Sequence, residues 1–317
     1  MARTDLVIGV AAALGAALVG AGWQVATRAA LTGSTLAPLD LAVFRYVVPA
    51  LVLLPVLLRQ GPWPSTRPRW LALPLVAGGG LPFGLLAMSG ASLAPVAHMG
   101  ALMPGTMPVL TALLAAALLG ERLRRRQVAG FGVVTAGVVL VSGSALGDAG
   151  LATLAGDALF LCAAMAWAVF GVAFRAAALP ALSATALMSL VSSVLVMPLW
   201  LASGTERLMQ APPAVLLQAI AMQGLVAGLL GVWTYAVAVR RLGAAPAALS
   251  GAAVPALSAA GGWLLLDELP ALPALAGIAL TMAGLVLAAP PGIIRRPAFR
   301  QAGSSLPAAP SARNPRA

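Results

Sequence analysis

The sequence predicts an all-α polytopic membrane protein with ten transmembrane helices, arranged as two inverted five-helix repeats. The first observation is composition: 61% of the 317 residues are hydrophobic, 9% are charged, and the mean hydropathy is +0.99. A soluble domain carries about a quarter charged residues. The second is a series of uncharged runs of about 20 residues, the length that spans a bilayer as a helix. The third is a match between the two halves of the chain at one fixed offset.

The same composition excludes several classes of function. A soluble enzyme would expose too much apolar surface to water, and disordered chains are poor in aliphatic side chains. All 19 basic residues are Arg and the net charge is +11, but nucleic-acid binding would need them gathered on a soluble face. One cysteine, Cys162, and one histidine, His98, cannot form an intramolecular disulfide or a multi-His metal site. We therefore predict no nucleic acid, metal or cofactor.

Charges and Pro or Gly breaks delimit the predicted helices. Apolar and polar residues do not alternate, so transmembrane strands are excluded. Residues 70–120 carry no formal charge apart from one on His98 if it is protonated, and they are long enough for two spans, which we separate at 92–95. The predicted spans are 6–26, 39–58, 70–90, 96–119, 128–146, 157–178, 183–202, 213–239, 245–266 and 272–289.

Short connections between these spans leave no room for a separate soluble domain. Arg3 followed by an apolar run resembles a secretory signal, but nine further spans favour an uncleaved first helix. We divide the chain into a first repeat, 1–147, a second repeat, 148–290, and a basic cytoplasmic tail, 291–317. The tail is rich in Pro, Ala, Ser and Arg and is predicted to be disordered.

The arginines predict the orientation. Most of them, including Arg124–Arg126, fall in the tail and in alternate connections, whereas the other connections hold only Arg28 and Arg207. Positively charged residues concentrate on the cytoplasmic side of membrane proteins. Both termini are therefore predicted to be cytoplasmic.

The internal repeat has an offset of 147 residues and needs no insertion. Because each half holds an odd number of spans, the second half enters the membrane from the opposite side. Inverted repeats of this kind build secondary transporters, whose substrate sites lie near the midplane between the repeats. The matched residues are Arg28 and Arg175, Pro108 and Pro255, Glu121 and Glu268, Gly130 and Gly277, and Gly137 and Gly284.

Each half ends with a proline, about a dozen small apolar residues, a glutamate and a glycine-punctuated helix. With Gly156-Asp157 at the opening of the second half and Ala166-Trp167 in the sixth span, this duplicated pattern resembles the EamA-type members of the drug/metabolite transporter superfamily over residues 5–290. The resemblance implies a ten-helix carrier of the bacterial inner membrane, commonly an exporter of amino acids or other small metabolites. It also implies that helices one to four and six to nine surround a central cavity.

One position departs from that family. Gly20 stands where the first helix often has a tryptophan, and Trp23 lies three residues later, about one helical turn. No family role is therefore transferred to Trp23.

Arg45 is the main candidate for a substrate contact. It lies about six residues into the second predicted span, about 9 Å deep at 1.5 Å per residue. An intramembrane Arg is costly and normally faces a cavity, a carbonyl or an anion. Arg45 therefore either binds a substrate carboxylate, or extends to the outer surface or pairs with Asp40.

His98 opens the fourth predicted span. Two roles are open: titration near neutral pH that couples transport to protons, or hydrogen-bonded packing near a helix end. The carboxylates, Asp157 and Glu121 among them, all fall at predicted helix ends. A buried acid relay is therefore not predicted, and we expect facilitated or weakly proton-linked exchange.

Gln24, Gln223 and Tyr235 are polar groups in otherwise apolar spans, where they need partners. Each is a candidate for the substrate cavity or for hydrogen bonding between helices. Trp167 either stacks on substrate or packs as an ordinary aromatic side chain.

Pro104, Pro108 and Pro255 are candidates for helix bends, because proline removes a backbone donor. The bends serve either as hinges or as fixed packing shape. Glu121 and Glu268 are predicted to be structural, binding nearby backbone donors or Arg side chains.

The matched glycines allow helices to approach closely, which favours either packing within the chain or contacts in a homodimer. The predicted partners are the lipid bilayer and a small-molecule substrate. The sequence thus predicts a carrier of a small, amino-acid-like metabolite by alternating access. A drug or lipid-linked substrate is the alternative within transport. An intramembrane lipid-modifying enzyme is a weaker alternative, because it would need His, Asp or Glu gathered at one depth.

Overall fold

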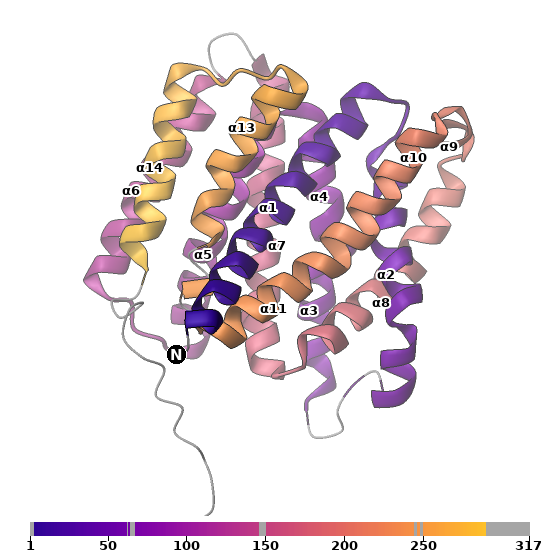
Figure 1. Cartoon of the computed structure of the whole chain (residues 1–317), viewed down its shortest axis with the longest axis horizontal. Coiled ribbons are helices and arrows are strands. Elements are labelled where there is room, and N and C mark those ends of the chain that lie inside the picture. The colour runs from indigo at the N-terminus through magenta and orange to yellow at the C-terminus, as the bar shows by residue number, and fades with distance from the viewer. Residues whose placement is uncertain are drawn as a thin grey trace, which may run out of the picture.

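The computed structural model describes residues 3–61, 63, 67–145, 150–243, 246–247 and 250–289. Within these ranges the regular elements are helices, packed side by side as a bundle (Figure 1). The predicted tail, 291–317, lies outside the described residues. We call the face that carries the N-terminus the N-terminal face. The face that carries the end of the first helix is the opposite face.

The helices of the first half follow the predicted order. They are α1 (Arg3–Gly33), α2 (Pro38–Gln60), η1 (Arg69–Leu71), α3 (Ala72–Gly79), α4 (Leu81–Leu93), α5 (Val96–Leu119) and α6 (Arg125–Ser144). The helices of the second half are α7 (Gly150–Ala177), α8 (Ala181–Ala202), α9 (Glu206–Gln210), α10 (Pro213–Ala219), η2 (Ile220–Leu230), α11 (Gly231–Leu242), η3 (Ser250–Ala253), α13 (Val254–Leu266) and α14 (Leu272–Ala288).

These elements make the predicted number of spans. Among the described residues, eight helical segments are long and apolar enough to cross a membrane. Two more apolar helices, Ser250–Leu266 and Leu272–Ala288, are shorter. They are near the lower limit of about 17 residues for a spanning helix. The prediction of an all-α bundle of ten spans is therefore confirmed, including the separation of the third and fourth spans at 92–95.

The third span is broken at Gly80, which the sequence analysis did not predict. The Gly80 carbonyl accepts a hydrogen bond of 2.5 Å from the Tyr46 hydroxyl. The Leu81 N–H donates one of 3.0 Å to Ser192 Oγ. Backbone groups freed by a break need such partners in a membrane. The run of three glycines that ends at Gly80 is the sequence signal for this break.

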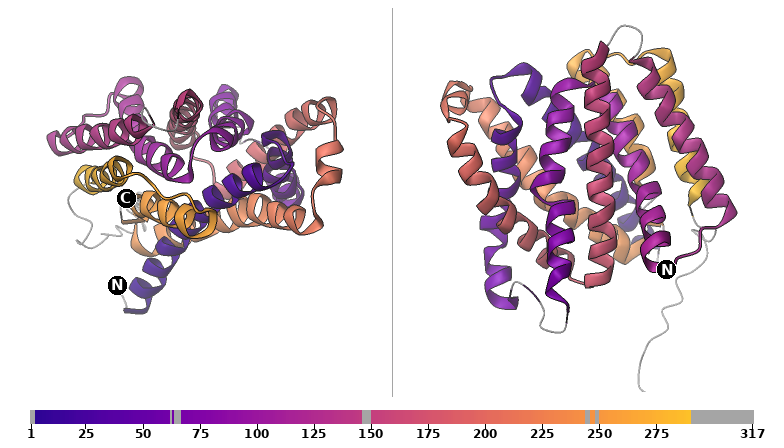
Figure 2. Two further views of the ribbon diagram at one scale, coloured as in Figure 1. Left: turned by 90° about the horizontal axis from the view of Figure 1, so that it is seen from above. Right: turned by 180° about the vertical axis from the view of Figure 1, so that it is seen from behind.

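Pairs of helices pack in a pattern that repeats between the halves. α1 packs on α11 and η2, and α7 packs on α3 and α4. α2 packs on α8, α5 on α13, and α6 on α14, so each of these pairs joins equivalent helices. The two outer pairs lie at opposite ends of the bundle, α6 with α14 at one end and α2 with α8 at the other (Figures 1 and 2). This is the arrangement expected of inverted repeats.

The matched glycines lie between α6 and α14. A Cβ at Gly137 would lie 2.6 Å from the Gly277 carbonyl oxygen, and one at Gly277 would lie 2.5 Å from that of Gly137. In the same way, a Cβ at Gly130 would lie 2.7 Å from the Gly284 carbonyl oxygen, and a Cβ at Gly284 would lie 2.7 Å from that of Gly130. Small residues allow backbones to approach this closely. The glycines are therefore used within the chain and give no support to the alternative of dimer contacts.

The three predicted helix-bend prolines differ in position. Pro104 and Pro108 lie inside α5, which continues through both. Pro255 lies in the first turn of α13, where its missing N–H is not needed. Pro255 therefore lies next to the junction of the 3₁₀ turn η3 with α13, inside the helical segment Ser250–Leu266, and the helix-bend role of the three prolines stays a prediction.

Substitution of Gly137 by Ala tests the close packing of the two repeats. We expect it to lower the free energy of unfolding by about 1–3 kcal/mol, because the added methyl group overpacks a backbone contact. Gly132→Ala on the same helix is the matched control, since a Cβ there has no atom within 4 Å. Thermal unfolding in detergent measures both variants. Equal stability of the two would contradict the described packing.

Candidate functional site

A buried glutamine connects two helices at the centre of the bundle. Gln223 lies on the π-helix η2 and is 1% exposed. Its Oε1 accepts a hydrogen bond of 2.7 Å from Trp23 Nε1, and its Nε2 donates one of 2.8 Å to Thr27 Oγ1. The Thr27 hydroxyl donates to the Trp23 carbonyl at 2.7 Å. The oxygen and the nitrogen of the Gln223 amide are thus both engaged, as burial of an amide requires.

Arg45 stacks on this group from α2. Its guanidinium carbon lies 4.5 Å from the centroid of the Trp23 ring and 5.8 Å from that of Phe83. Both distances are within cation–π range. The Arg45 Nη1 atom is buried and has no hydrogen-bond partner among the described residues. The ion pairs of the described chain do not include Arg45. The guanidinium therefore keeps its charge without a carboxylate.

A row of aromatic rings extends from this cation. Phe83 on α4 lies 6.3 Å from Trp23 and 4.9 Å from Trp167, measured between ring centroids. Trp167 on α7 continues to Phe170 at 4.9 Å. Trp23 and Phe83 thus place apolar surface against Arg45, and the other two rings continue the row away from it. We call the following set the central cluster: Trp23, Thr27, Arg45, Phe83, Trp167 and Gln223.

Two glycines of η2 bring α2 close to the central cluster. A Cβ at Gly224 would lie 2.6 Å from Val48 Cβ. A Cβ at Gly228 would lie 2.5 Å from Cγ of Pro49, the next residue of α2. Small residues four apart commonly allow such contacts between membrane helices. Gln223 directly precedes Gly224, and Arg45 lies about one turn before Val48. This contact therefore holds the guanidinium near the Gln223 amide. π-Helical turns like those of η2 frequently occur at functional sites.

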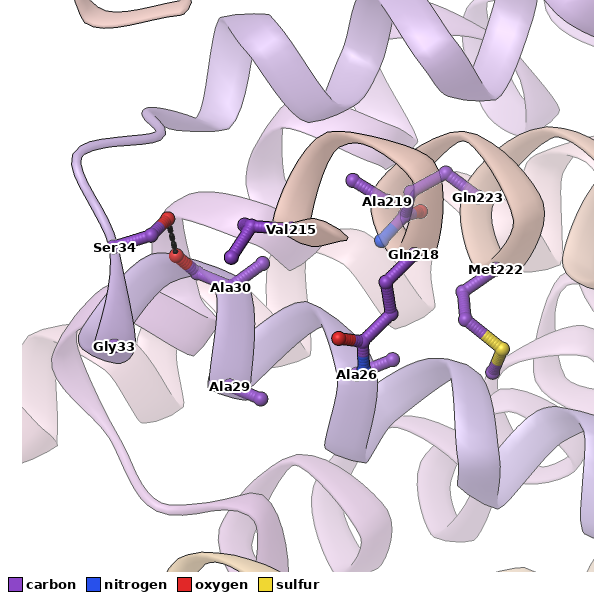
Figure 3. Close-up of a pocket in the computed structure, with 10 residues that line it drawn as sticks. All are labelled: Ala26, Ala29, Ala30, Gly33, Ser34, Val215, Gln218, Ala219, Met222 and Gln223. Carbon is purple, nitrogen blue, oxygen red and sulfur yellow. Dashed lines mark hydrogen bonds between the residues drawn. The ribbon is translucent and has the colours of Figure 1, made fainter. Parts of the chain in front are cut away.

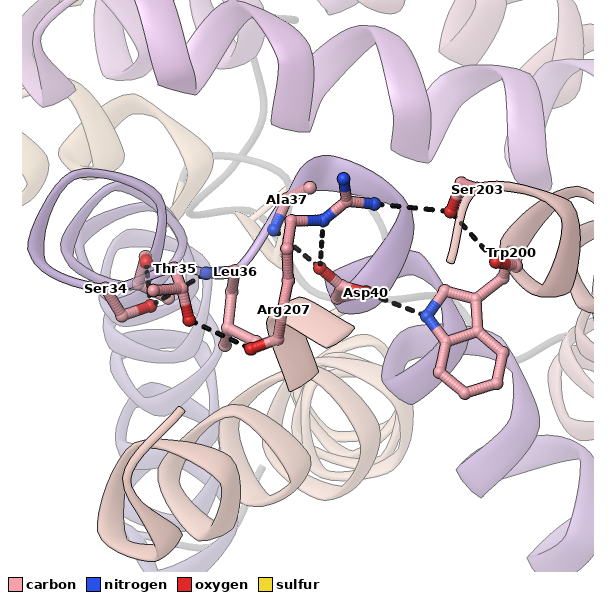
Figure 4. Close-up of polar contacts among 9 residues, drawn as sticks. Ser34, Thr35, Leu36, Ala37, Asp40, Trp200, Ser203 and Arg207 are labelled. Carbon is pink, nitrogen blue, oxygen red and sulfur yellow. Dashed lines mark hydrogen bonds and ion pairs between the residues drawn. The ribbon is translucent and has the colours of Figure 1, made fainter. Parts of the chain in front are cut away.

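Asp40 does not pair with Arg45, although the sequence left that alternative open. Its Oδ1 accepts a hydrogen bond of 2.7 Å from Trp200 Nε1, and its Oδ2 accepts one of 2.7 Å from the Ala37 N–H (Figure 4). Arg207 Nε lies 3.7 Å from the same Oδ2. Asp40 is fully buried. It ties the start of α2 to α8 and α9, and its charge is neutralised there.

A cavity of about 220 Å³ reaches the central cluster between α1 and the α10–η2 helix (Figure 3). Small residues of α1 form one wall, among them Ala26 and Ala30. The other wall includes Gln218, Met222 and Gln223. Of the residues that line this cavity, Gln223 alone belongs to the central cluster.

The other predicted polar residues lie apart from the central cluster. Gln24 is buried and accepts a hydrogen bond of 2.8 Å from Ser258 Oγ, which joins α1 to α13. This contact matches the alternative of hydrogen bonding between helices. Tyr235 on α11 is 44% exposed, two residues from Trp233, which is 60% exposed. We therefore leave Tyr235 out of the proposed site.

His98 and Asp157 form a buried pair between α5 and α7. His98 Nδ1 lies 2.9 Å from Asp157 Oδ1, and the side chains are 7% and 4% exposed. Ser144 Oγ on α6 lies 3.5 Å from His98 Nε2. The prediction that Asp157 stands at a helix end is wrong, because α7 begins earlier, at Gly150. A buried carboxylate is therefore present where the sequence analysis expected none.

Two ion pairs join the repeats, and they use the matched residues of the sequence. Arg28 Nε lies 2.6 Å from Glu268 Oε1 near the opposite face. Arg175 Nη1 lies 3.3 Å from Glu121 Oε1 near the N-terminal face. Each pair takes its Arg from one repeat and its Glu from the other. The expectation that the glutamates bind Arg side chains agrees with this geometry.

The sequence singled out part of this site. It named Arg45, Trp167 and Gln223, which the structure brings together. It assigned no role to Trp23 and did not consider Phe83. Their partners lie far away along the chain, 200 residues in the case of Trp23 and Gln223. The signal available in the sequence was the tryptophan itself, displaced by about one helical turn from the expected position.

This chain is similar to known transporters over most of its length. The model of the EamA-like transporter family matches residues 7–143 and 154–289, one match in each half. A solved crystal structure of a protein has 25% sequence identity to this chain and a TM-score of 0.58. That match covers 86% of this chain and 97% of the other. No curated protein matches.

A double-mutant cycle tests the pair of His98 and Asp157. We expect His98→Leu to lower the free energy of unfolding by about 3–5 kcal/mol, because it leaves a buried carboxylate without its partner. Addition of Asp157→Leu should restore part of this loss, since no uncompensated charge remains. Chemical or thermal unfolding measures the cycle. Additive effects of the two substitutions would contradict a direct contact.

Proposed function

Because this chain belongs to the EamA-like transporter family of the drug/metabolite transporter superfamily, we propose that it is a secondary carrier that moves a small solute by alternating access. Family membership supports transport across a membrane as the activity. The proposal adds the mechanism, the class of solute and the orientation. In this proposal the solute binds at the central cluster, between the two repeats.

The main support for the alternating-access mechanism is that the two repeat-related ion pairs differ in their burial and in their hydrogen bonding. The Arg28–Glu268 side chains are only 15% and 19% exposed. Arg28 Nη1 also donates to the Ala91 carbonyl at 2.9 Å, and Glu268 Oε2 accepts from the Val96 N–H at 2.8 Å. This network joins α1, α4 and α5 to the end of α13. It therefore fastens the opposite face of the bundle.

The equivalent pair on the other face is looser. The Arg175 and Glu121 side chains are 46% and 51% exposed, and their closest atoms are 3.3 Å apart. Exposed ion pairs contribute little to stability, about 0–1 kcal/mol. Inverted repeats can exchange conformations, so that each half adopts the arrangement of the other. In our proposal the Arg175–Glu121 pair closes when the Arg28–Glu268 pair opens, which exposes the central cluster to the two sides in turn.

We propose a small metabolite rather than a drug or lipid-linked substrate, and the small size of the cavity that adjoins the central cluster at Gln223 supports this choice. The cavity volume of about 220 Å³ is below the range of about 300–1,000 Å³ for sites that hold drug-sized ligands. An enzyme is the alternative from another class. The described residues contain no group of three or more His, Cys, Asp or Glu that could hold a metal. His98 and Asp157 bind each other, and we propose no catalytic role for this pair.

Direction and orientation complete the proposal. We place the N-terminal face in the cytoplasm of a bacterial cell, because most arginines lie at that face by their positions between the helices. Export of the solute is the direction suggested by the family resemblance.

Transport into proteoliposomes tests the function. The purified chain is reconstituted and incubated with a defined mixture of amino acids, organic acids and nucleosides, and the retained solutes are measured by mass spectrometry. We expect at least one small solute to be retained above the level of protein-free liposomes. Retention of none would contradict a carrier of small solutes. Chemical conversion of a solute without retention would favour an enzyme.

Removal of one glutamate at a time tests the two ion pairs. In a Cys162→Ser background, the reactivity of an Ala94→Cys thiol reports opening of the opposite face, since Ala94 is fully buried. We expect Glu268→Gln to raise the labelling rate about tenfold, because loss of about 1.4 kcal/mol shifts an equilibrium tenfold. Labelling is done in nanodiscs, where both faces meet the reagent.

The matched control is Glu121→Gln, the equivalent change in the other repeat. It should leave the labelling rate of the Ala94→Cys thiol unchanged or lower it. Glu121→Gln should instead raise the labelling rate of an Ala177→Cys thiol, which reports opening of the N-terminal face. Equal effects of both glutamate substitutions at both thiols would show that the ion pairs do not control opposite faces.

A further inference from the structure

We propose that the transported solute is a small organic anion, a carboxylate with an apolar body and no ammonium group, and that its carboxylate binds Arg45. This inference rests on the proposed function, since it names the substrate class of the same central cluster. It also revises the sequence-based expectation of an amino-acid-like solute. The charge of Arg45, its buried Nη1 without a hydrogen-bond partner and its apolar surroundings each support one part of it.

The positive charge of Arg45 favours an anionic ligand. Arg45 is positively charged under all physiological conditions, because a guanidinium does not lose its proton in proteins. The nearest acidic residue along α2, Asp40, is engaged by Trp200, Ala37 and Arg207. The central cluster therefore has an uncompensated positive charge among its described residues. A bound anion neutralises it, whereas a cation would be repelled and the ammonium group of a zwitterion would find no carboxylate.

The hydrogen-bond donors of the Arg45 guanidinium favour a carboxylate as the anionic group. A guanidinium carries its N–H groups in its own plane. The contacts of Arg45 with Trp23 and Phe83 are cation–π contacts over the rings and do not use those donors, whereas the Tyr46 side chain also interacts with the guanidinium. Nη1 in particular is buried without a partner. A buried donor left unpaired is unfavourable, and a carboxylate is the group that fits a guanidinium edge through two parallel hydrogen bonds.

The surroundings of the cation determine the rest of the ligand. Trp23 and Phe83 place aromatic rings against Arg45, and Trp167 continues this aromatic surface from Phe83. Gln223 is the nearest polar side chain of η2, but its oxygen is committed to Trp23 and its nitrogen to Thr27. Additional polar groups on the ligand would therefore meet apolar surface without hydrogen-bond partners. The site accordingly favours a ligand whose only strongly polar group is its carboxylate.

The position of Arg45 connects binding to movement. α2 belongs to the first repeat and packs tightly on η2 of the second through Gly224 and Gly228. An anion at Arg45 therefore sits beside a contact between the repeats, where its binding can favour one arrangement over the other.

Three matched probes test the inference: 3-phenylpropanoate, phenylalanine and 2-phenylethylamine. They share one apolar body and differ in charge, as an anion, a zwitterion and a cation. The full chain is studied in lipid nanodiscs by calorimetric titration and in proteoliposomes by uptake of labelled probe. We expect 3-phenylpropanoate to bind at least tenfold more tightly than either of the others and to be taken up in preference.

Arg45→Met is the test variant, and Arg59→Met is its matched control on the exposed end of the same helix. We expect Arg45→Met to weaken binding of 3-phenylpropanoate by about 10- to 100-fold, as loss of charge-assisted hydrogen bonds does. Its melting temperature should stay equal or rise, because it removes a buried charge that has no carboxylate. A marked fall in melting temperature would indicate that Arg45 is structural and would overturn the proposal.

The outcomes separate this inference from the proposed function. Uptake of phenylalanine or 2-phenylethylamine without 3-phenylpropanoate would overturn the anion proposal and leave the carrier function intact. Tight binding of 3-phenylpropanoate that depends on Arg45, without uptake of any probe, would support the anion site and contradict the carrier. Failure of 3-phenylpropanoate to bind would overturn the anion site.

Discussion

Contacts between the two inverted repeats hold this bundle together, and the principal ones occur twice. Gly137 meets Gly277 and Gly130 meets Gly284 across α6 and α14. The ion pairs follow the same relation, since the Arg of each repeat pairs with the Glu of the other. A chain with little charge and no water around its spans depends on close packing and on satisfied polar groups. The repeat supplies both, and the central cluster, which we propose as the substrate site, lies where the halves meet.

The two halves are related in sequence but are not equivalent in this conformation. One ion pair is part-buried and supported by two backbone groups, while its counterpart is half exposed. The central cluster is asymmetric as well, because Arg45 of the first repeat corresponds to Ser192 of the second. Ser192 supports the broken third span through Leu81, whereas Arg45 remains without a carboxylate. In the proposed mechanism, the symmetry of the repeats accounts for two arrangements of the bundle, and the unmatched residues of the central cluster account for ligand binding.

Periodicity and charge predicted the spans, their order and the repeat, because these depend on local composition and on the thickness of a bilayer. They also identified Arg45, since a charge inside an apolar run is visible without a structure. The break at Gly80, the π-helix around Gln223 and the burial of Asp157 depend on partners distant in the chain. Asp157 shows the limit clearly. An error of seven residues in the start of α7 moved it from the interior to a predicted helix end.

Distances across both faces, measured by pulsed electron paramagnetic resonance in nanodiscs, test the central claim most directly. Spin labels at Leu93 and Leu269, both exposed, span the opposite face, and labels at Leu118 and Ala176 span the N-terminal face. The account predicts two populations in which one distance lengthens as the other shortens, with their ratio shifted by Glu268→Gln. Distances that lengthen together, or a single population that does not respond to this substitution, would contradict movement of one repeat against the other.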